Sequence, residues 1–154
     1  MEAGKVFGVT LSTGQQAMWI VKQPFMGVDF ARLVEKKLGP FMAAAFPDLS
    51  KRVLLLDGEK LMHTPEATAA LREAGISVLP NWPAYSPDLN PQENVWPWLQ
   101  TKLRESEKET DEFSKFVQRL KSVARRYPNA ESLIPSMAER VSACLALRGQ
   151  FGIW

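Results

Sequence analysis

Histidine and cysteine, which are common in zinc sites and as catalytic residues, are scarce in this chain. Among 154 residues there is one histidine, His63, and one cysteine, Cys144. This excludes zinc sites built from several Cys and His ligands, and a Ser-His-Asp triad could form only through His63. Cys144 cannot form a disulfide within the chain, and its apolar helical surroundings predict a buried thiol.

Glu93 follows a proline-rich stretch. Pro83, Pro87 and Pro91 stand at four-residue intervals, and proline is tolerated in a helix mainly in its first turn. The stretch therefore predicts a rigid loop that ends in a helix beginning at Pro91. Asn90 then stands at the N-cap and Glu93 at the third helical position, the spacing of a capping box in which both side chains bond backbone N–H groups.

Asp57 stands at the end of the apolar run RVLLLD, residues 52–57. A short apolar run of this kind is typical of a strand buried on both faces in a largely parallel sheet. The local explanation of Asp57 is an Asx-type turn with Gly58. His63 lies a few residues further on, where a hydrogen-bonding role beside the next helix is expected.

The sequence on either side of Asp57 and His63 has the patterns of a β-hairpin, helices and a further strand. The runs 5–12 and 15–22, separated by Ser-Thr-Gly, predict two antiparallel strands. Residues 29–46 predict an amphipathic helix interrupted near Gly39 and Pro40. Thr64 as N-cap, Pro65 and Gly75 delimit a short helix before a strand at 76–79, so strand, helix and strand form a parallel crossover unit. The stripe expected on the first helix comprises Phe30, Leu33, Val34, Leu38, Phe41 and Ala45.

Three further amphipathic helices are expected after the proline-rich loop. They begin at Pro91, after a Thr110 cap and at Pro135, and the last ends at Gly149. The inward residues expected on them are Val95, Leu99 and Leu103, then Phe113, Phe116, Val117, Leu120 and Val123, then Met137, Val141, Cys144 and Leu145. The aromatic residues near the loop, Trp82, Tyr85, Trp96 and Trp98, are expected to pin it to the core rather than to stack on bases.

The block SPDLNPQENVW, residues 86–96, resembles the SPDLNPxEN block of the mariner-type (Tc/mariner superfamily) DDE transposases. The match includes two prolines and two asparagines in register, and the order of elements from residue 5 to 149 is similar as well. The resemblance implies an α/β, ribonuclease-H-like fold with a mixed sheet and flanking helices, lacking its first strand. Residues 1–105 would form the partial catalytic core, and residues 106–154 a C-terminal helical extension of the same domain.

The resemblance also implies a catalytic role for two carboxylates. Glu93 corresponds to the third acid of the family and Asp57 to the second, with His63 and Asn94 as active-site neighbours. Such acids hold two Mg²⁺ or Mn²⁺ ions that support DNA strand cleavage and joining. The implied partners are DNA, as transposon ends and target, and a second copy of the chain as a homodimer.

Three departures from the family pattern affect this interpretation. The printed chain has no counterpart of the first catalytic Asp, so activity near background is expected for this polypeptide alone. Gly58 and Glu59 replace the Asn-Ala that commonly follows the second acid, and Glu59 could compete for metal. Pro97 stands where the family commonly has glycine and should kink the helix beside Glu93. The alternative is a non-catalytic, transposase-derived module that binds DNA or another protein.

Charge and hydropathy add few constraints. The net charge of +2 neither supports nor excludes DNA binding. No apolar run long enough for a membrane span and no signal-peptide pattern is seen, so the expected location is nuclear in a eukaryote and otherwise cytoplasmic, not secreted. DNA-binding residues are not identified by the sequence. Basic residues of the later helices that could contact phosphates, but more simply form solvated faces, are Lys102, Arg104, Lys115, Arg119, Lys121, Arg125 and Arg126.

Overall fold

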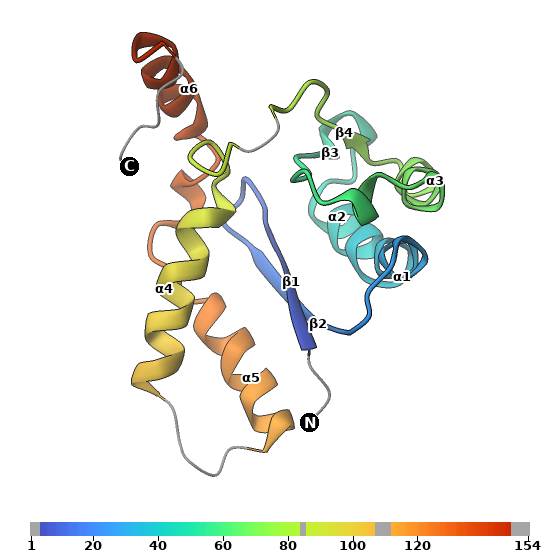
Figure 1. Ribbon diagram of the computed structural model, residues 1–154, viewed down its shortest axis with the longest axis vertical. Helices are drawn as coiled ribbons and strands as arrows, with labels where there is room; N and C mark the ends of the chain where they lie inside the picture. Colours follow the sequence, from blue (N-terminus) through green and yellow to red (C-terminus); the bar gives the residue numbers. More distant parts are fainter. Residues whose placement is uncertain (1–3, 84–85, 107–111, 149–154) are drawn as a thin grey trace. The chain divides into compact units, whose positions relative to one another are not determined.

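The computed structural model describes residues 4–83, 86–106 and 112–148. The chain divides into two compact units, one formed by residues 1–23 and 86–154 and the other by residues 24–85. Each unit is described by itself below, with element labels as in Figure 1. Within the described ranges, no helix combines the length and the apolar character needed to cross a bilayer.

The first unit begins with the predicted hairpin. Strands β1 (Gly4–Thr10) and β2 (Gln16–Lys22) pair antiparallel, with Thr10 opposite Gln16 at the turn end. The turn is closed by bonds from the Leu11 N–H to the Gln15 carbonyl and from the Gly14 N–H to the Leu11 carbonyl. Gly14 has a φ of 84°, which a glycine adopts at little cost.

Two helices pack on this hairpin and form the core of the unit. Helix α4 (Gln92–Glu105) contacts β1, helix α5 (Phe113–Ala124) contacts β2, and the two helices contact each other (Figure 1). Trp96 and Trp98 pack against this core. The ring centroids of Trp98 and Tyr127 lie 5.3 Å apart in an edge-to-face arrangement. These two tryptophans thus have the predicted packing role. The buried core residues are Met18, Val95, Leu99, Leu120, Val123, Ala124 and Leu133.

The last helices differ from prediction in the face they bury. A short 3₁₀ turn (Ala130–Ser132) precedes helix α6 (Met137–Ala146), which begins after Pro135 rather than at it. Val141 is 40% exposed and Leu145 is 74% exposed, whereas Arg140 is buried. Phe113 on α5 is likewise exposed, and Cys144 is only partly buried. The predicted Thr110 cap, Gly149 helix end and Tyr85 packing lie outside the described residues.

The second unit begins with a long helical stretch that contains a π-helical segment. Helix α1 (Gly27–Leu33) leads into the π-helical segment (Val34–Leu38) and then into α2 (Gly39–Ala45). The Gly39 N–H donates to the Val34 carbonyl, five residues back, which places the predicted interruption just before Pro40. Asp29 accepts from the Met26 N–H at 3.0 Å and so stabilises the start of α1.

The π-helical segment changes which residues face the core. Phe30, Val34, Leu38 and Met42 are at most 1% exposed and stand at four-residue intervals. In a regular α-helix each such step would overshoot a full turn by about 40°, but the wider π turn absorbs this drift. Met42 therefore replaces the predicted Phe41 and Ala45 as the buried residue.

The rest of the second unit is a strand–helix–strand arrangement. Strands β3 (Val53–Leu54) and β4 (Ser77–Val78) pair in parallel, as predicted. A 3₁₀ turn (Leu49–Lys51) precedes β3, and a second one (Lys60–His63) and helix α3 (Pro65–Glu73) lie between the strands. The prediction that the 52–57 strand is buried on both faces is wrong, because Leu54 and Leu56 are buried while Val53 is 50% exposed.

Local signals account for both ends of α3. The Thr64 hydroxyl accepts from the Ala67 N–H at 3.3 Å, and Pro65 begins the helix. Gly75 has a φ of 67° just past the helix end. The predicted helix boundaries are thus confirmed, because capping chemistry specifies them residue by residue.

Candidate acidic site

Asp57 lies just beyond β3 and is exposed. Its Oδ1 accepts from the Glu59 N–H at 2.9 Å, which confirms the Asx-type turn. Among the described residues, no donor reaches its second carboxylate oxygen. A side chain built on Gly58 would meet nothing within 4 Å, so the surroundings of this turn are open within the described chain. The Asx turn therefore leaves one Asp57 oxygen available as a ligand.

His63 is linked to Asp57 through the backbone. Its Nε2 lies 2.8 Å from the Asp57 carbonyl oxygen. Because a carbonyl oxygen only accepts, Nε2 must carry the hydrogen. His63 is exposed at the end of the 3₁₀ turn. It therefore has the expected hydrogen-bonding role in the loop that carries Asp57, and its place as an active-site neighbour stays a prediction.

Glu93 stands in the first turn of α4 and is exposed. The helix begins at Gln92, so Pro91 rather than the predicted Asn90 stands at the N-cap. The Asn90 Oδ1 nevertheless accepts from the Gln92 N–H at 3.0 Å. The reciprocal half of the predicted capping box is wrong, since the Asn90 N–H donates to the Pro87 carbonyl instead. Among the described residues, the Glu93 carboxylate has no hydrogen-bond or ion-pair partner. The loop backbone thus replaces Glu93 in capping and leaves both of its oxygens free.

Asn94, the next residue, has a partner that the sequence did not reveal. Its Oδ1 accepts from Nη1 of Arg140 on α6 at 2.7 Å. Arg140 was not among the predicted site residues. A signal was present, because Arg140 stands three residues after Met137 and four before Cys144, on the predicted apolar stripe, but its charge argued for an outward position.

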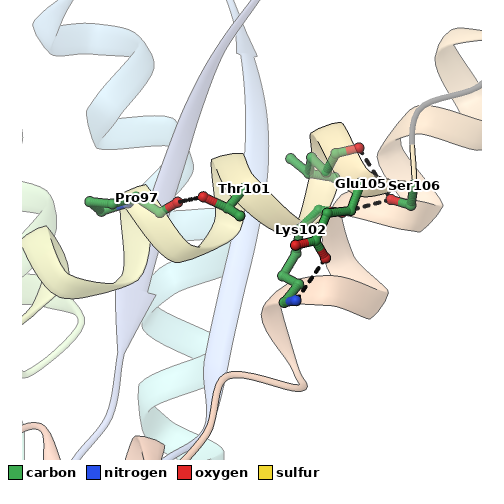
Figure 2. A network of polar contacts seen from close by, with 6 residues as sticks. Pro97, Thr101, Lys102, Glu105 and Ser106 are labelled. Atoms are coloured by element: carbon green, nitrogen blue, oxygen red, sulfur yellow. Dashed lines mark hydrogen bonds and ion pairs between the residues drawn. The ribbon is translucent and has the colours of Figure 1, made fainter.

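The far end of α4 is held by side chains of its own (Figure 2). The Thr101 hydroxyl donates to the Pro97 carbonyl, and the Ser106 hydroxyl donates to the Lys102 carbonyl. Lys102 also pairs with Glu105 at 2.7 Å. Arg119 on α5 donates to the Ser106 carbonyl. Lys102 and Arg119 thus have local partners, as expected of residues on solvated faces. Pro97 lies inside α4, which continues as a helix on both sides of it.

The exposed carboxylates of Asp57 and Glu93 have the chemistry that a hard divalent cation requires. Free carboxylate oxygens at Asp57 and Glu93 are ligands that Mg²⁺ and Mn²⁺ prefer. Within the described ranges, however, no three His, Cys, Asp or Glu side chains gather into a metal-binding group. Asp57 and Glu93 belong to different units, so their convergence on shared metal ions stays a prediction. Each carboxylate alone fits the role of a ligand.

The comparisons with known proteins identify the family. A model of the DDE superfamily endonuclease family matches residues 4–129, which is most of the chain. The chain belongs to this family. No curated protein sequence matches it.

Two solved structures have the same fold as this DDE family chain. One is the crystal structure of the catalytic domain of Mos1 mariner transposase, with a TM-score of 0.70 and 16% identity over 97% of this chain and 82% of that one. The other is the Mos1 transposase catalytic domain with raltegravir and manganese, with a TM-score of 0.69, 16% identity, and coverage of 97% and 83%. The predicted α/β, ribonuclease-H-like fold of mariner-type enzymes is thereby confirmed.

Proposed function

We propose that this chain supplies two of the metal-binding carboxylates, Asp57 and Glu93, of a DDE-type DNA strand-transfer site. The observation that carries the proposal is the state of Glu93. It lies in the SPDLNPQEN block of a DDE family member, and its carboxylate is exposed and has no partner among the described residues. When bound, Mg²⁺ or Mn²⁺ would activate a water or a DNA 3′ hydroxyl and stabilise the leaving oxygen. The residues of this chain would hold and orient those ions.

Metal binding by the two carboxylates is tested by adding Mn²⁺ to the ¹⁵N-labelled chain and recording paramagnetic broadening of the backbone amides. The amides of residues 57–59 and 92–94 are expected to broaden first. Asp57→Asn and Glu93→Gln should each reduce the effect at both segments, because the two side chains share the ions. Broadening that is equal at all exposed carboxylates would contradict the proposal.

The chain offers a matched control for each variant. Asp48 accepts from the N–H two residues further on, as Asp57 does, and Glu139 is an exposed acid in the first turn of α6, as Glu93 is in α4. Asp48→Asn and Glu139→Gln should leave the broadening at 57–59 and 92–94 unchanged.

We further propose that this polypeptide alone does not complete a catalytic site. The described residues include no group of three His, Cys, Asp or Glu side chains that could hold a metal ion, which supports this. Nicking of supercoiled DNA with Mg²⁺ or Mn²⁺ should equal that of the Asp57→Asn/Glu93→Gln double variant. If the chain nicks DNA above that level and each single variant abolishes the activity, Asp57 and Glu93 are both needed for catalysis. That result would contradict the proposal that this polypeptide alone has an incomplete catalytic site.

DNA binding without catalysis is the second candidate, and one observation on α5 favours it. Lys115 and Lys121 on α5 and Arg125 at its C-cap are exposed, and within the described residues none of them has an ion-pair partner. Unpaired cations on one helix are suited to contacts with DNA phosphates. The logarithm of the binding constant for duplex DNA should fall linearly with the logarithm of the salt concentration. Each Gln substitution that removes a phosphate contact should reduce the slope of this line by about one.

The control for this experiment is Lys102→Gln, because Lys102 is already paired with Glu105. It should change neither the affinity nor the salt slope. Binding that persists with an unchanged slope when Lys115, Lys121 and Arg125 are all Gln would exclude these residues as the DNA contact.

We also propose a homodimer on the strength of the family resemblance. Sedimentation equilibrium with and without DNA would test it.

A further inference from the structure

Arg140 is the one charged residue that is buried in the described part of the chain, at 7% exposure. Its Nη1 donates to Asn94 Oδ1 at 2.7 Å, and its Nε donates to the Ser136 hydroxyl at 3.2 Å. The Ser136 hydroxyl in turn donates to the Leu133 carbonyl at 2.7 Å. Neither partner of the guanidinium is a carboxylate, so the bonds are directed contacts to neutral oxygens rather than an ion pair.

The cost of burying this charge makes a purely stabilising role a weak explanation. Removing a cation from water is expensive, and an apolar residue of similar size often stabilises a core equally well. A buried guanidinium does have one advantage, because its planar donors fix the orientation of whatever they bond. Here they fix Asn94 in the first turn of α4.

That turn is weakly held by its own backbone. The Glu93 N–H donates to the Asn90 carbonyl and the Asn94 N–H donates to the Pro91 carbonyl, each at 3.1 Å and each only three residues back. The Glu93 carbonyl would normally accept from the N–H four residues on, but that residue is Pro97, which has none. The turn that carries Glu93 therefore lacks one of the backbone hydrogen bonds of a regular α-helix.

We propose that Arg140 is a positioning residue, which acts through Asn94 to fix the first turn of α4 and hence the direction of the Glu93 carboxylate. The hydrogen bond from Arg140 on α6 to Asn94, which we call the tether, compensates for the backbone hydrogen bond that the Glu93 carbonyl lacks because of Pro97. The importance of this tether for metal binding rests on the proposed function of Glu93. The tether itself is a property of the metal-free protein and can be tested without metal.

The first experiment is hydrogen exchange of the backbone amides along α4 in the metal-free chain. Arg140→Met keeps the side-chain length but removes the donors, so exchange at Glu93, Asn94 and Val95 should accelerate about tenfold relative to Leu99 and Leu103. Arg140→Lys keeps one charged donor and should restore most of the protection. Asn94→Ala should match Arg140→Met, and the double variant should be no faster than either single variant.

Two further variants separate positioning from general stabilisation. Arg119→Met removes a guanidinium that bonds the opposite end of α4, at the Ser106 carbonyl, and should leave exchange at Glu93 unchanged relative to the rest of the helix. Pro97→Ala restores the N–H that the Glu93 carbonyl lacks, so the effect of Arg140→Met should shrink to about twofold in that background. Acceleration that is uniform along α4, or an Arg140→Met effect that Pro97→Ala does not change, would overturn the proposal.

The second experiment measures the apparent Mn²⁺ affinity at Glu93 from paramagnetic broadening. Arg140→Met should weaken it several-fold and Arg140→Lys should recover it, with the Arg119→Met control unchanged. If the wild-type chain shows no Mn²⁺ effect at Glu93, the proposed function fails, and the exchange experiment alone then decides whether Arg140 positions this turn.

Discussion

Nε2 of His63 lies 2.8 Å from the backbone carbonyl oxygen of Asp57 and closes the loop between them. This bond fixes the ring tautomer, because the carbonyl can only accept. The two residues are thus coupled through the backbone, and the Asp57 carboxylate remains free of the imidazole.

The neutral ring of His63 should therefore be the Nε2–H tautomer, as read from the ¹⁵N shifts of the two ring nitrogens. His63→Ala should lower the free energy of unfolding by about 0.5–1.5 kcal/mol, the usual net value of one hydrogen bond, measured by urea denaturation. An Nδ1–H tautomer would show that the loop is closed by some other contact.

Pro97→Ala should stabilise the chain. Pro97 is exposed inside α4, so little packing is lost, while the Glu93 carbonyl gains a donor and ring crowding is relieved. The expected gain is up to about 3 kcal/mol in the free energy of unfolding. Pro65→Ala is the matched control, because Pro65 begins α3, where a missing N–H has no cost. An equal gain from both substitutions would contradict this explanation.

Gln16→Leu should also stabilise the chain. Both polar atoms of the Gln16 amide are buried without a hydrogen-bond partner in the described structure, and leaving such a group unpaired costs roughly 1–3 kcal/mol. Leucine has a similar size and no polar side-chain atoms that need hydrogen-bond partners, so the midpoint of thermal unfolding should rise. Gln15→Leu, at the exposed neighbouring position, should not raise it. If Gln16→Leu destabilises the chain, an ordered water satisfies the native amide.

Asp48 should titrate below its ordinary range. Hydrogen bonds from the Ser50 hydroxyl and then from the Ser50 N–H lower the pKa of Asp48 from 3.8. A lowered pKa means that its contribution to stability is present above pH 3.8 and is lost as the pH falls through the folded-state value. Ser50→Ala should move the midpoint of the Asp48 ¹³C titration upward, because it removes the larger cause.

Local signals predicted those parts of the fold that depend on a few neighbouring residues. Thr64 and Gly75 mark the ends of α3, and the block around Glu93 identified the family. The exposed state of Val53 and the burial of Arg140 depend on contacts with distant elements, which neither periodicity nor residue type encodes. The convergence of Asp57 and Glu93 is of the same kind and stays a prediction, since local spacing carries no information on how two units assemble.

The segment from Val34 to Leu38 has a consequence for sequence change. A π turn holds one residue more than an α turn, so it is equivalent to a single-residue insertion in an otherwise regular helix. Deleting one of residues 35–37, together with Pro40→Ala, would bring Val34 and Leu38 to three-residue spacing and let an unbroken α-helix present the same buried side chains. The same deletion within α3 would instead rotate everything beyond it by about 100°, so length variation in this unit should be tolerated best at the π turn.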